Sequence, residues 1–201
     1  MAISLVAVGA KITAAITNAI IGQVNAQGLT GVVPTSVAGT GVSVGASGKV
    51  ILTAASSASL NGCFTSTYTH YLVVLDFPTI TGTVNVLARL RLSGTDLSTS
   101  SYLYKGVVDA TVSNGTTTGF YISRNGSGVA AISENVDIWH PNEATAKRIV
   151  YNGTSINAGA PFKESGSGLN ATATAYDGLT IALDGAGSIT GTITVYGYNN
   201  N

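Results

Sequence analysis

Acidic and aromatic side chains gather in one short stretch of the chain, and this stretch is the best equipped for chemistry. Glu134, Asp137 and Glu143 flank Trp139 and His140. A glycosidase needs two carboxyl groups that face one cleft, and a tryptophan beside carboxylates also suits a surface that stacks on a sugar ring. A tryptophan at a strand end can equally pack into the core or a subunit interface, which is the interpretation we favour. Sugar binding ranks above sugar cleavage.

The residues that other common catalytic sites require do not occur in a suitable pattern. A nucleophilic triad needs a base, and the histidines are His70 and His140, whereas the serines within 126–128 and 166–168 read as parts of turns. For the single cysteine, Cys63, we expect a small buried thiol. The sequence has no phosphate-binding glycine loop and no calcium loop. We therefore predict a protein that is not an enzyme, without catalytic residues, cofactor or metal.

Arg89 and Arg91 form the one local basic feature, and they point to the same face of an expected strand. They could grip an acidic ligand, although pairing with an acid such as Asp76 or Asp96, or with a neighbouring subunit, is the simpler expectation. The other basic residues are scattered and the net charge is zero. Because phosphate binding needs clustered Lys and Arg, nucleic acid is not an expected partner.

The chain carries very little charge for its length. Only 9% of its 201 residues are charged, against about 25% in a typical globular domain. Such a chain is expected to cover much of its surface with copies of itself or with a larger assembly. Its apolar runs are far shorter than the ~18 residues that span a bilayer, so no membrane is expected. The apolar start of the chain lacks a basic flank, which argues against a signal peptide.

The pattern beyond residue 57 is one of short strands separated by turn signals. Alternation over Val84–Leu92 and the apolar run Tyr71–Phe77 are typical of strands. Further strands are expected at 102–108, 119–122, 129–138, 147–151, 179–183 and 191–198. Asn-Gly at 114, 125 and 152 and the segment 184–187 predict tight turns. These features indicate an all-β, jelly-roll-like antiparallel β-sandwich.

The N-terminal part differs in pattern from the rest. Residues 9–28 predict a short helix with one apolar stripe, which is formed by Ile12, Ile16, Ile20 and Val24. Glycines and valines between 29 and 57 indicate short strands or an extended, packed connector. We therefore expect residues 1–57 to serve anchoring or oligomerisation and residues 58–201 to form the sandwich. A helix folded back on its own β domain is the alternative.

Seven segments of the chain carry a resemblance to a known family: Lys11–Ala15, Gln23–Thr30, Val33–Val37, Gly39–Val44, Asn61–Ser66, Ala175–Thr180 and Gly191–Gly197. Together they resemble small bacteriophage virion proteins, most of all those of actinobacterial phages. The resemblance implies a virion component, assembled in the bacterial cytoplasm as a homotrimer and bound to other virion proteins through its N-terminal segment. It carries no catalytic residues over to this chain.

The expected function is that of a minor tail or host-attachment protein. Surface contact with a host glycan would involve Trp139, Asn142 and the strand around Tyr102–Tyr104, with Arg89 and Arg91 as further candidates. A capsid decoration protein, on the head rather than the tail, is the alternative. An enzyme that degrades envelope polysaccharide is a third hypothesis, which the scarcity of acidic residues disfavours.

Overall fold

Alternating burial explains why this chain forms sheets. In strand β6 (His70–Thr81), Tyr71, Val73, Leu75 and Phe77 are fully buried, and the residues between them are more exposed. Successive side chains of a strand point to opposite faces, so one face of β6 enters the core. The computed structural model describes residues 28–108, 111–123, 129–157 and 159–199.

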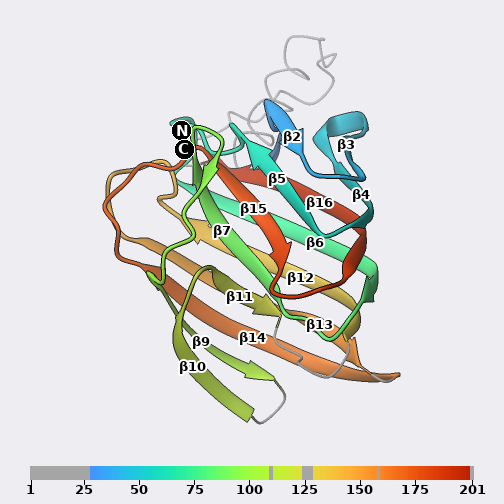
Figure 1. Cartoon of the computed structure of the whole chain (residues 1–201). Helices are drawn as coiled ribbons and strands as arrows, with labels where there is room; N and C mark the ends of the chain where they lie inside the picture. The colour runs from blue at the N-terminus through green and yellow to red at the C-terminus, as the bar shows by residue number, and fades with distance from the viewer. Residues whose placement is uncertain (1–27, 109–110, 124–128, 158, 200–201) are drawn as a thin grey trace, which may run out of the picture.

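The described residues form two antiparallel sheets that pack face to face (Figure 1). The large sheet has the strand order β10-β9-β14-β13-β12-β6-β16-β4-β3, and β1 pairs with β16 as its tenth strand. Besides β6, its strands are β1 (Leu29–Val32), β3 (Val42–Val44), β4 (Val50–Ala55), β9 (Tyr102–Val108), β10 (Thr111–Thr117), β12 (Val129–Trp139), β13 (Lys147–Asn157), β14 (Ala160–Asn170) and β16 (Ser188–Tyr198).

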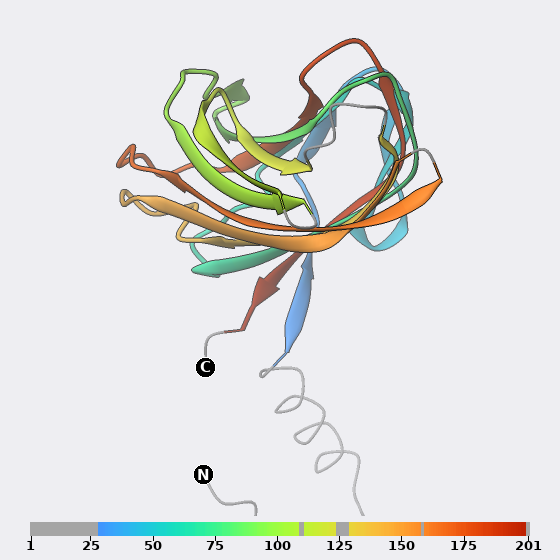
Figure 2. The same ribbon diagram turned by 90° about the horizontal axis from the view of Figure 1, so that it is seen from below.

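The small sheet closes the other side of the core. Its order is β11-β7-β15-β5-β2, with β8 paired to β7. Its strands are β2 (Ser36–Ala38), β5 (Ser57–Asn61), β7 (Val86–Leu92), β8 (Thr95–Asp96), β11 (Phe120–Ser123) and β15 (Gly178–Leu183). Seen from below, the long strands of the large sheet curve around the small one (Figure 2).

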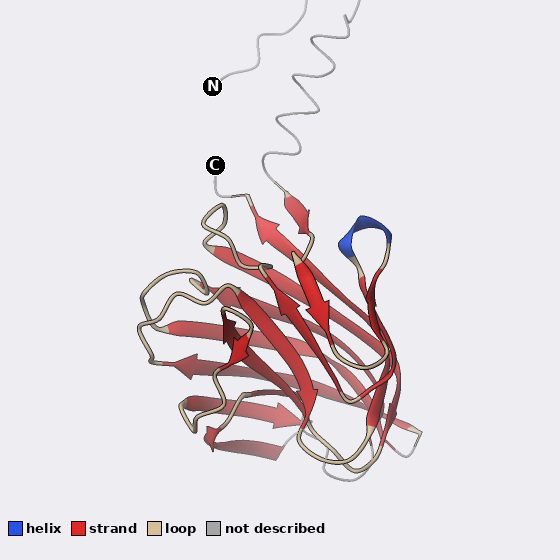
Figure 3. Cartoon of the chain, turned by 45° about the horizontal axis from the view of Figure 1, so that its top comes forward, coloured by secondary structure: helices blue, strands red, loops and turns tan. Residues whose placement is uncertain are grey.

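The expected all-β antiparallel sandwich is confirmed. Side chains from both sheets, such as Leu75 and Phe77 of the large sheet and Leu90 and Ile181 of the small one, belong to a single hydrophobic core. One short 3₁₀ turn, η1 (Ala46–Gly48), is the helical element within the described residues (Figure 3). The expected N-terminal helix, with Ile12, Ile16, Ile20 and Val24, lies outside the described residues.

Residues 29–57 take part in both sheets. β1 pairs with β16, β3 pairs with β4, which itself pairs with β16, and β2 pairs with β5 of the small sheet. Figure 2 shows β1 beside the end of β16. This stretch therefore forms short strands that pack in the sandwich, which is one of the two possibilities that the sequence left open.

Two of the expected Asn-Gly turns are strand interiors instead. Asn114-Gly115 lies inside β10 and Asn152-Gly153 inside β13. In β13, Gly153 leaves room for the Glu134 side chain, because a Cβ at Gly153 would lie 2.5 Å from the Glu134 Oε2 atom. The expected turn at 184–187 is confirmed as the connection between β15 and β16.

The segment 166–168, also read as a turn, lies in the middle of β14. A Cβ at Gly166 would lie 2.3 Å from the Tyr151 hydroxyl, and one at Gly168 would lie 2.5 Å from the Phe120 ring. These glycines leave room for two large rings in the core. Glycine here therefore marks a close approach and not a chain reversal.

Candidate functional site: the outer face of the large sheet

The face of the large sheet that points away from the small sheet, here called the outer face, carries most of the exposed apolar side chains. Strand register and alternation place on it six of the nine exposed large hydrophobic residues in the described part of the chain. They are Leu29, Ile51, Leu103, Val112, Val150 and Ile156. Of these six, Leu103 and Val150 line one depression together, and clustered exposed apolar side chains mark interaction sites more often than scattered ones do.

Three aromatic rings stack side by side on the outer face, from three adjacent strands. The His70 ring of β6 lies between Trp139 of β12, at a centroid distance of 4.4 Å, and Tyr198 of β16, at 3.9 Å. The two interplanar angles are 16° and 10°, so the three rings are nearly parallel. Cross-strand aromatic pairs stabilise a sheet and fix its register. We call this set the aromatic row.

Asp137 contacts two of the three rings of the aromatic row. Its Oδ1 atom lies 3.1 Å from His70 Nε2 and accepts a hydrogen bond of 2.8 Å from the Tyr198 hydroxyl. Burial lowers the pKa of His70 below its ordinary value, although the Asp137 carboxylate opposes this shift. Burial, together with the bond to Asp137, raises the pKa of Tyr198 to about 12. The lowered pKa favours the neutral imidazole, and because a carboxylate only accepts hydrogen bonds, a neutral His70 in this contact carries its proton on Nε2.

The stacking leaves one face of the Trp139 ring open to a ligand. One face of its ring is covered by His70, so a sugar can stack only on the opposite side. That side faces β13, where Arg148 is the cross-strand partner of Trp139. The contact expected for Trp139 is therefore possible on the side of Arg148.

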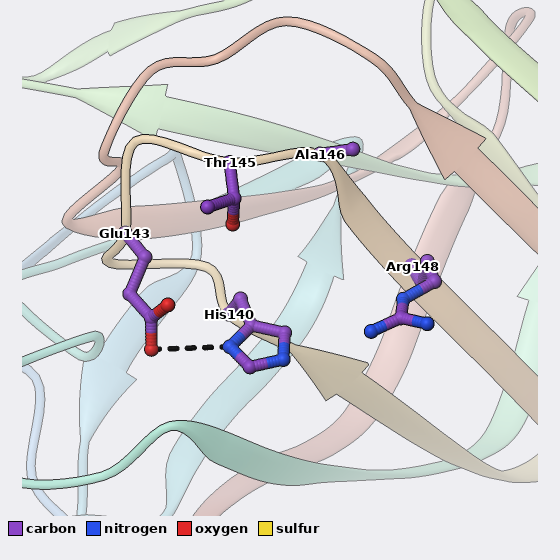
Figure 4. Close-up of a pocket in the computed structure, with 5 residues that line it drawn as sticks. All are labelled: His140, Glu143, Thr145, Ala146 and Arg148. Atoms are coloured by element: carbon purple, nitrogen blue, oxygen red, sulfur yellow. Dashed lines mark ion pairs between the residues drawn. The ribbon is translucent and has the colours of Figure 1, made fainter.

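Arg148 borders two depressions on this part of the molecule. One, of about 380 Å³, lies at the β12–β13 connection and is lined by His140, Glu143, Thr145, Ala146 and Arg148. Figure 4 shows the His140 ring between Glu143 and Arg148, with His140 Nδ1 3.1 Å from Glu143 Oε1.

The second depression, of about 510 Å³, lies over β9, β14 and β13. Its lining includes Leu103, Lys105, Arg148, Val150 and Leu169. Apolar side chains and two cations therefore meet at one exposed place on the sheet. Lys105 and Arg148 were not singled out from the sequence, although the strand alternation that turns Tyr102 inward also turns Leu103 and Lys105 outward.

The other residues expected at a surface have structural contacts. The Asn142 amide donates to the Phe64 and Tyr176 carbonyl oxygens, at 3.2 and 3.3 Å, and so ties two loops together. Tyr102, expected near a contact surface, is fully buried, and its hydroxyl accepts from the Leu90 N–H and donates to the Leu97 carbonyl. Neither residue belongs to the outer face.

Arg89 and Arg91 lie on β7, in the small sheet, and so are on the opposite layer from Trp139. Arg91 is buried and forms the expected ion pair with Asp96. Arg89 is half-buried and donates to the Thr118 carbonyl at 3.0 Å. The buried guanidinium of Arg91 thus has a structural contact and is not exposed to a ligand.

The acidic residues that a glycosidase would need are separated by the sheet. Glu134 and Asp137 are three positions apart on β12, so Glu134 points into the core and Asp137 to the outer face. Glu134 and Glu164 are both 1% exposed and flank Gly153 on the inner side of the sheet. Burial, with Glu164 nearby, raises the pKa of Glu134 to about 9. This carboxyl is a neutral core group at pH 7.

Cys63 is fully buried, as expected, and burial raises the pKa of its thiol to about 12. Within the described part of the chain, no group of three His, Cys, Asp or Glu side chains could hold a metal ion. Among the same residues, no helix has the length and apolarity needed to cross a membrane.

Comparisons of the chain with protein-family models, with curated proteins and with solved structures give no match.

Proposed function

We propose that this chain is a non-enzymatic structural protein of a bacteriophage virion, a minor tail or host-attachment protein that displays its β-sandwich. The observation that carries the proposal is the outer face, where exposed apolar residues, the aromatic row and two cations lie together. A chain with 9% charged residues and no net charge would present such a face to a partner rather than to water.

The connection between the outer face and the N-terminal segment supports a role in assembly. Leu29 of β1 pairs with Tyr198, the last ring of the aromatic row. The expected anchoring residues, Ile12, Ile16, Ile20 and Val24, precede this strand directly in the sequence. We propose that this segment binds other virion proteins and holds sister chains together as a homotrimer.

A binding role is better supported than cleavage. Glu134 and Asp137 lie on opposite faces of β12, and the Glu134 carboxyl is buried. Retaining and inverting glycosidases both need two carboxyl groups on either side of one scissile bond. Glu134 and Asp137 do not form such a pair.

A capsid decoration protein is the second candidate. The exposed apolar side chains of the outer face, such as Leu103, Val112 and Val150, favour it, because they would suit burial against a capsid shell. In that case the face would need no host ligand.

Labelling of intact particles from the source with a gold-conjugated antibody, viewed by negative-stain electron microscopy, tests these proposals. Label at the tail or its tip is the expected result for an attachment protein. Label spread over the head would replace attachment by decoration. Absence of label from every particle, with the chain detected in the same cells by immunoblot, would contradict a virion role.

A further inference from the structure

The depression over β9, β14 and β13 has an uncompensated positive charge. Lys105 and Arg148 are exposed, and neither forms an ion pair or a side-chain hydrogen bond with any of the described residues. Their strands are separated only by β14, so the strand axes lie roughly 10 Å apart. Two cations at that separation can reach the same bound group from opposite sides.

Among the described residues, Asp137 and Glu143 make their contacts with groups other than Lys105 and Arg148. Asp137, opposite Val150 on the next strand, accepts from the Tyr198 hydroxyl and lies 3.1 Å from His70 Nε2. Glu143 lies against His140. The positive charge of Lys105 and Arg148 is therefore available to a ligand.

The remaining lining suits the carbon skeleton of a sugar. Leu103 is 47% exposed and Val150 is 45% exposed, and Leu169 of β14 lies between Leu103 and Arg148. Ser167 adds an exposed hydroxyl group in the neighbouring row, between Lys105 and Val150. A volume of about 510 Å³ falls within the range of small-ligand sites. An aliphatic floor with one hydroxyl and two cations fits a sugar that carries a negative group.

We propose that this depression binds an anionic saccharide, carboxylated or phosphorylated, of a host surface polymer; the inference rests on the proposed attachment function. Lys105 and Arg148 clamp the acidic group, while Leu103, Val150 and Leu169 contact the apolar side of the sugar ring. Arginine suits this role because its planar fork matches the geometry of carboxylate and phosphate.

The site continues toward a second sugar. Arg148 also borders the depression at the β12–β13 connection, and it lies next to the open side of Trp139. A polymer that passes Arg148 would therefore meet both depressions in succession. This arrangement favours a chain of sugars over a single monosaccharide.

Binding of the full chain to three immobilised polymers tests the inference. Polygalacturonate supplies carboxylates, phosphomannan supplies phosphates, and dextran is the neutral control. We expect binding to at least one acidic polymer and not to dextran, with an affinity that falls as NaCl is raised from low to high concentration. Lys105→Gln and Arg148→Gln should each weaken binding about tenfold, because each removes a charge-assisted contact.

Lys49→Gln is the matched control, because Lys49 is exposed outside the two depressions, and it should bind like the parent chain. Arg148→Lys should recover part of the affinity. Thermal unfolding of each variant shows that the fold is kept.

Failure of the parent chain to bind either acidic polymer more tightly than dextran would overturn the inference, as would equal losses in Lys49→Gln and Arg148→Gln. Tail labelling, or adsorption of particles blocked by antibody to this chain, would in that case still uphold attachment. Particles that never carry the chain would contradict the proposed function whatever the polymers show.

Discussion

His70 and Tyr198 lie face to face on adjacent strands, with 3.9 Å between ring centroids, and both are bonded to the same Asp137 oxygen. The shared carboxylate joins β6, β12 and β16 at one point of the outer face. A neutral imidazole is thereby placed between two other rings. Because burial lowers the pKa of His70, we expect this part of the outer face to respond to acid pH.

The first prediction concerns the protonation of His70. The pKa of His70 is lower in the folded chain than in the unfolded chain, where it is about 6.5. As the pH falls through 6.5, the unfolded chain therefore takes up a proton on His70 before the folded chain does. Acidification through this range should therefore lower the free energy of unfolding. Trp139 is the single tryptophan and stacks on His70, and an imidazolium accepts an excited electron from indole. Fluorescence of the folded chain should fall at a pH below 6.5.

His70→Gln should abolish that fluorescence step, whereas His140→Gln should preserve it. His140 is the matched control because the chain has two histidines and His140 is absent from the stacked set. A step that persists in His70→Gln would show that another group quenches Trp139.

The second prediction concerns the buried Glu134 carboxyl. The unfolded chain loses this proton near the ordinary pKa of 4.5, whereas the folded chain keeps it to about pH 9. The contribution of Glu134 to stability is therefore fully present below pH 4.5 and declines as the pH rises toward 9. Glu134→Gln removes this loss, so its stability relative to the parent should increase between pH 5 and pH 8 in urea unfolding.

Asp76→Asn is the control, because Asp76 is exposed on the neighbouring strand β6. A gain in stability between pH 5 and pH 8 of the same size in Asp76→Asn would show that the effect is not specific to Glu134. A constant difference between Glu134→Gln and the parent chain across this range would contradict the raised pKa.

The third prediction is that Arg91 contributes more to the free energy of unfolding than Arg89 does. Arg91 pairs with Asp96, and its guanidinium also donates to Ser59 Oγ at 2.9 Å and Asn61 Oδ1 at 3.0 Å. Arg91→Ala should therefore reduce the free energy of unfolding by about 3–5 kcal/mol, because it leaves a partly buried acid without its partner. Arg89→Ala should cost about 1 kcal/mol, since its described bonds go to Thr118 alone. Equal losses in urea unfolding would contradict the structural role of Arg91.

The fourth prediction concerns Gly166. A Cβ there would lie 2.3 Å from the Tyr151 hydroxyl and 2.4 Å from the adjoining ring carbon. Gly166→Ala should therefore lower the free energy of unfolding by about 1–3 kcal/mol. Gly31→Ala, where a Cβ would meet no atom within 4 Å, should be close to neutral. If Gly166→Ala lowers the free energy of unfolding less in a Tyr151→Val background than in the parent chain, the clash with Tyr151 is confirmed. An unchanged loss would show that the Tyr151 ring is not its cause.

The all-β class followed from local alternation, which is why β6, β7, β9, β12 and β16 were predicted near their observed bounds. β10 and β14 were not predicted, because their segments are rich in Gly, Ser, Asn and Thr and read as turns. In β14 the glycines leave room for Tyr151 on the adjacent strand β13 and for Phe120 across the core. Nothing in the local sequence indicates those rings.

The opposite orientation of Glu134 and Asp137 was implicit in their odd separation along one strand. The aromatic row was not, because His70, Trp139 and Tyr198 lie far apart in the sequence and meet through the register of β12, β6 and β16. The same holds for Lys105 and Arg148. Alternation has a period of two residues and is fixed locally, so the sequence by itself determined which side chains could share a face. Hydrogen bonds between distant strands set the register, so only the tertiary structure decided which of those side chains became neighbours.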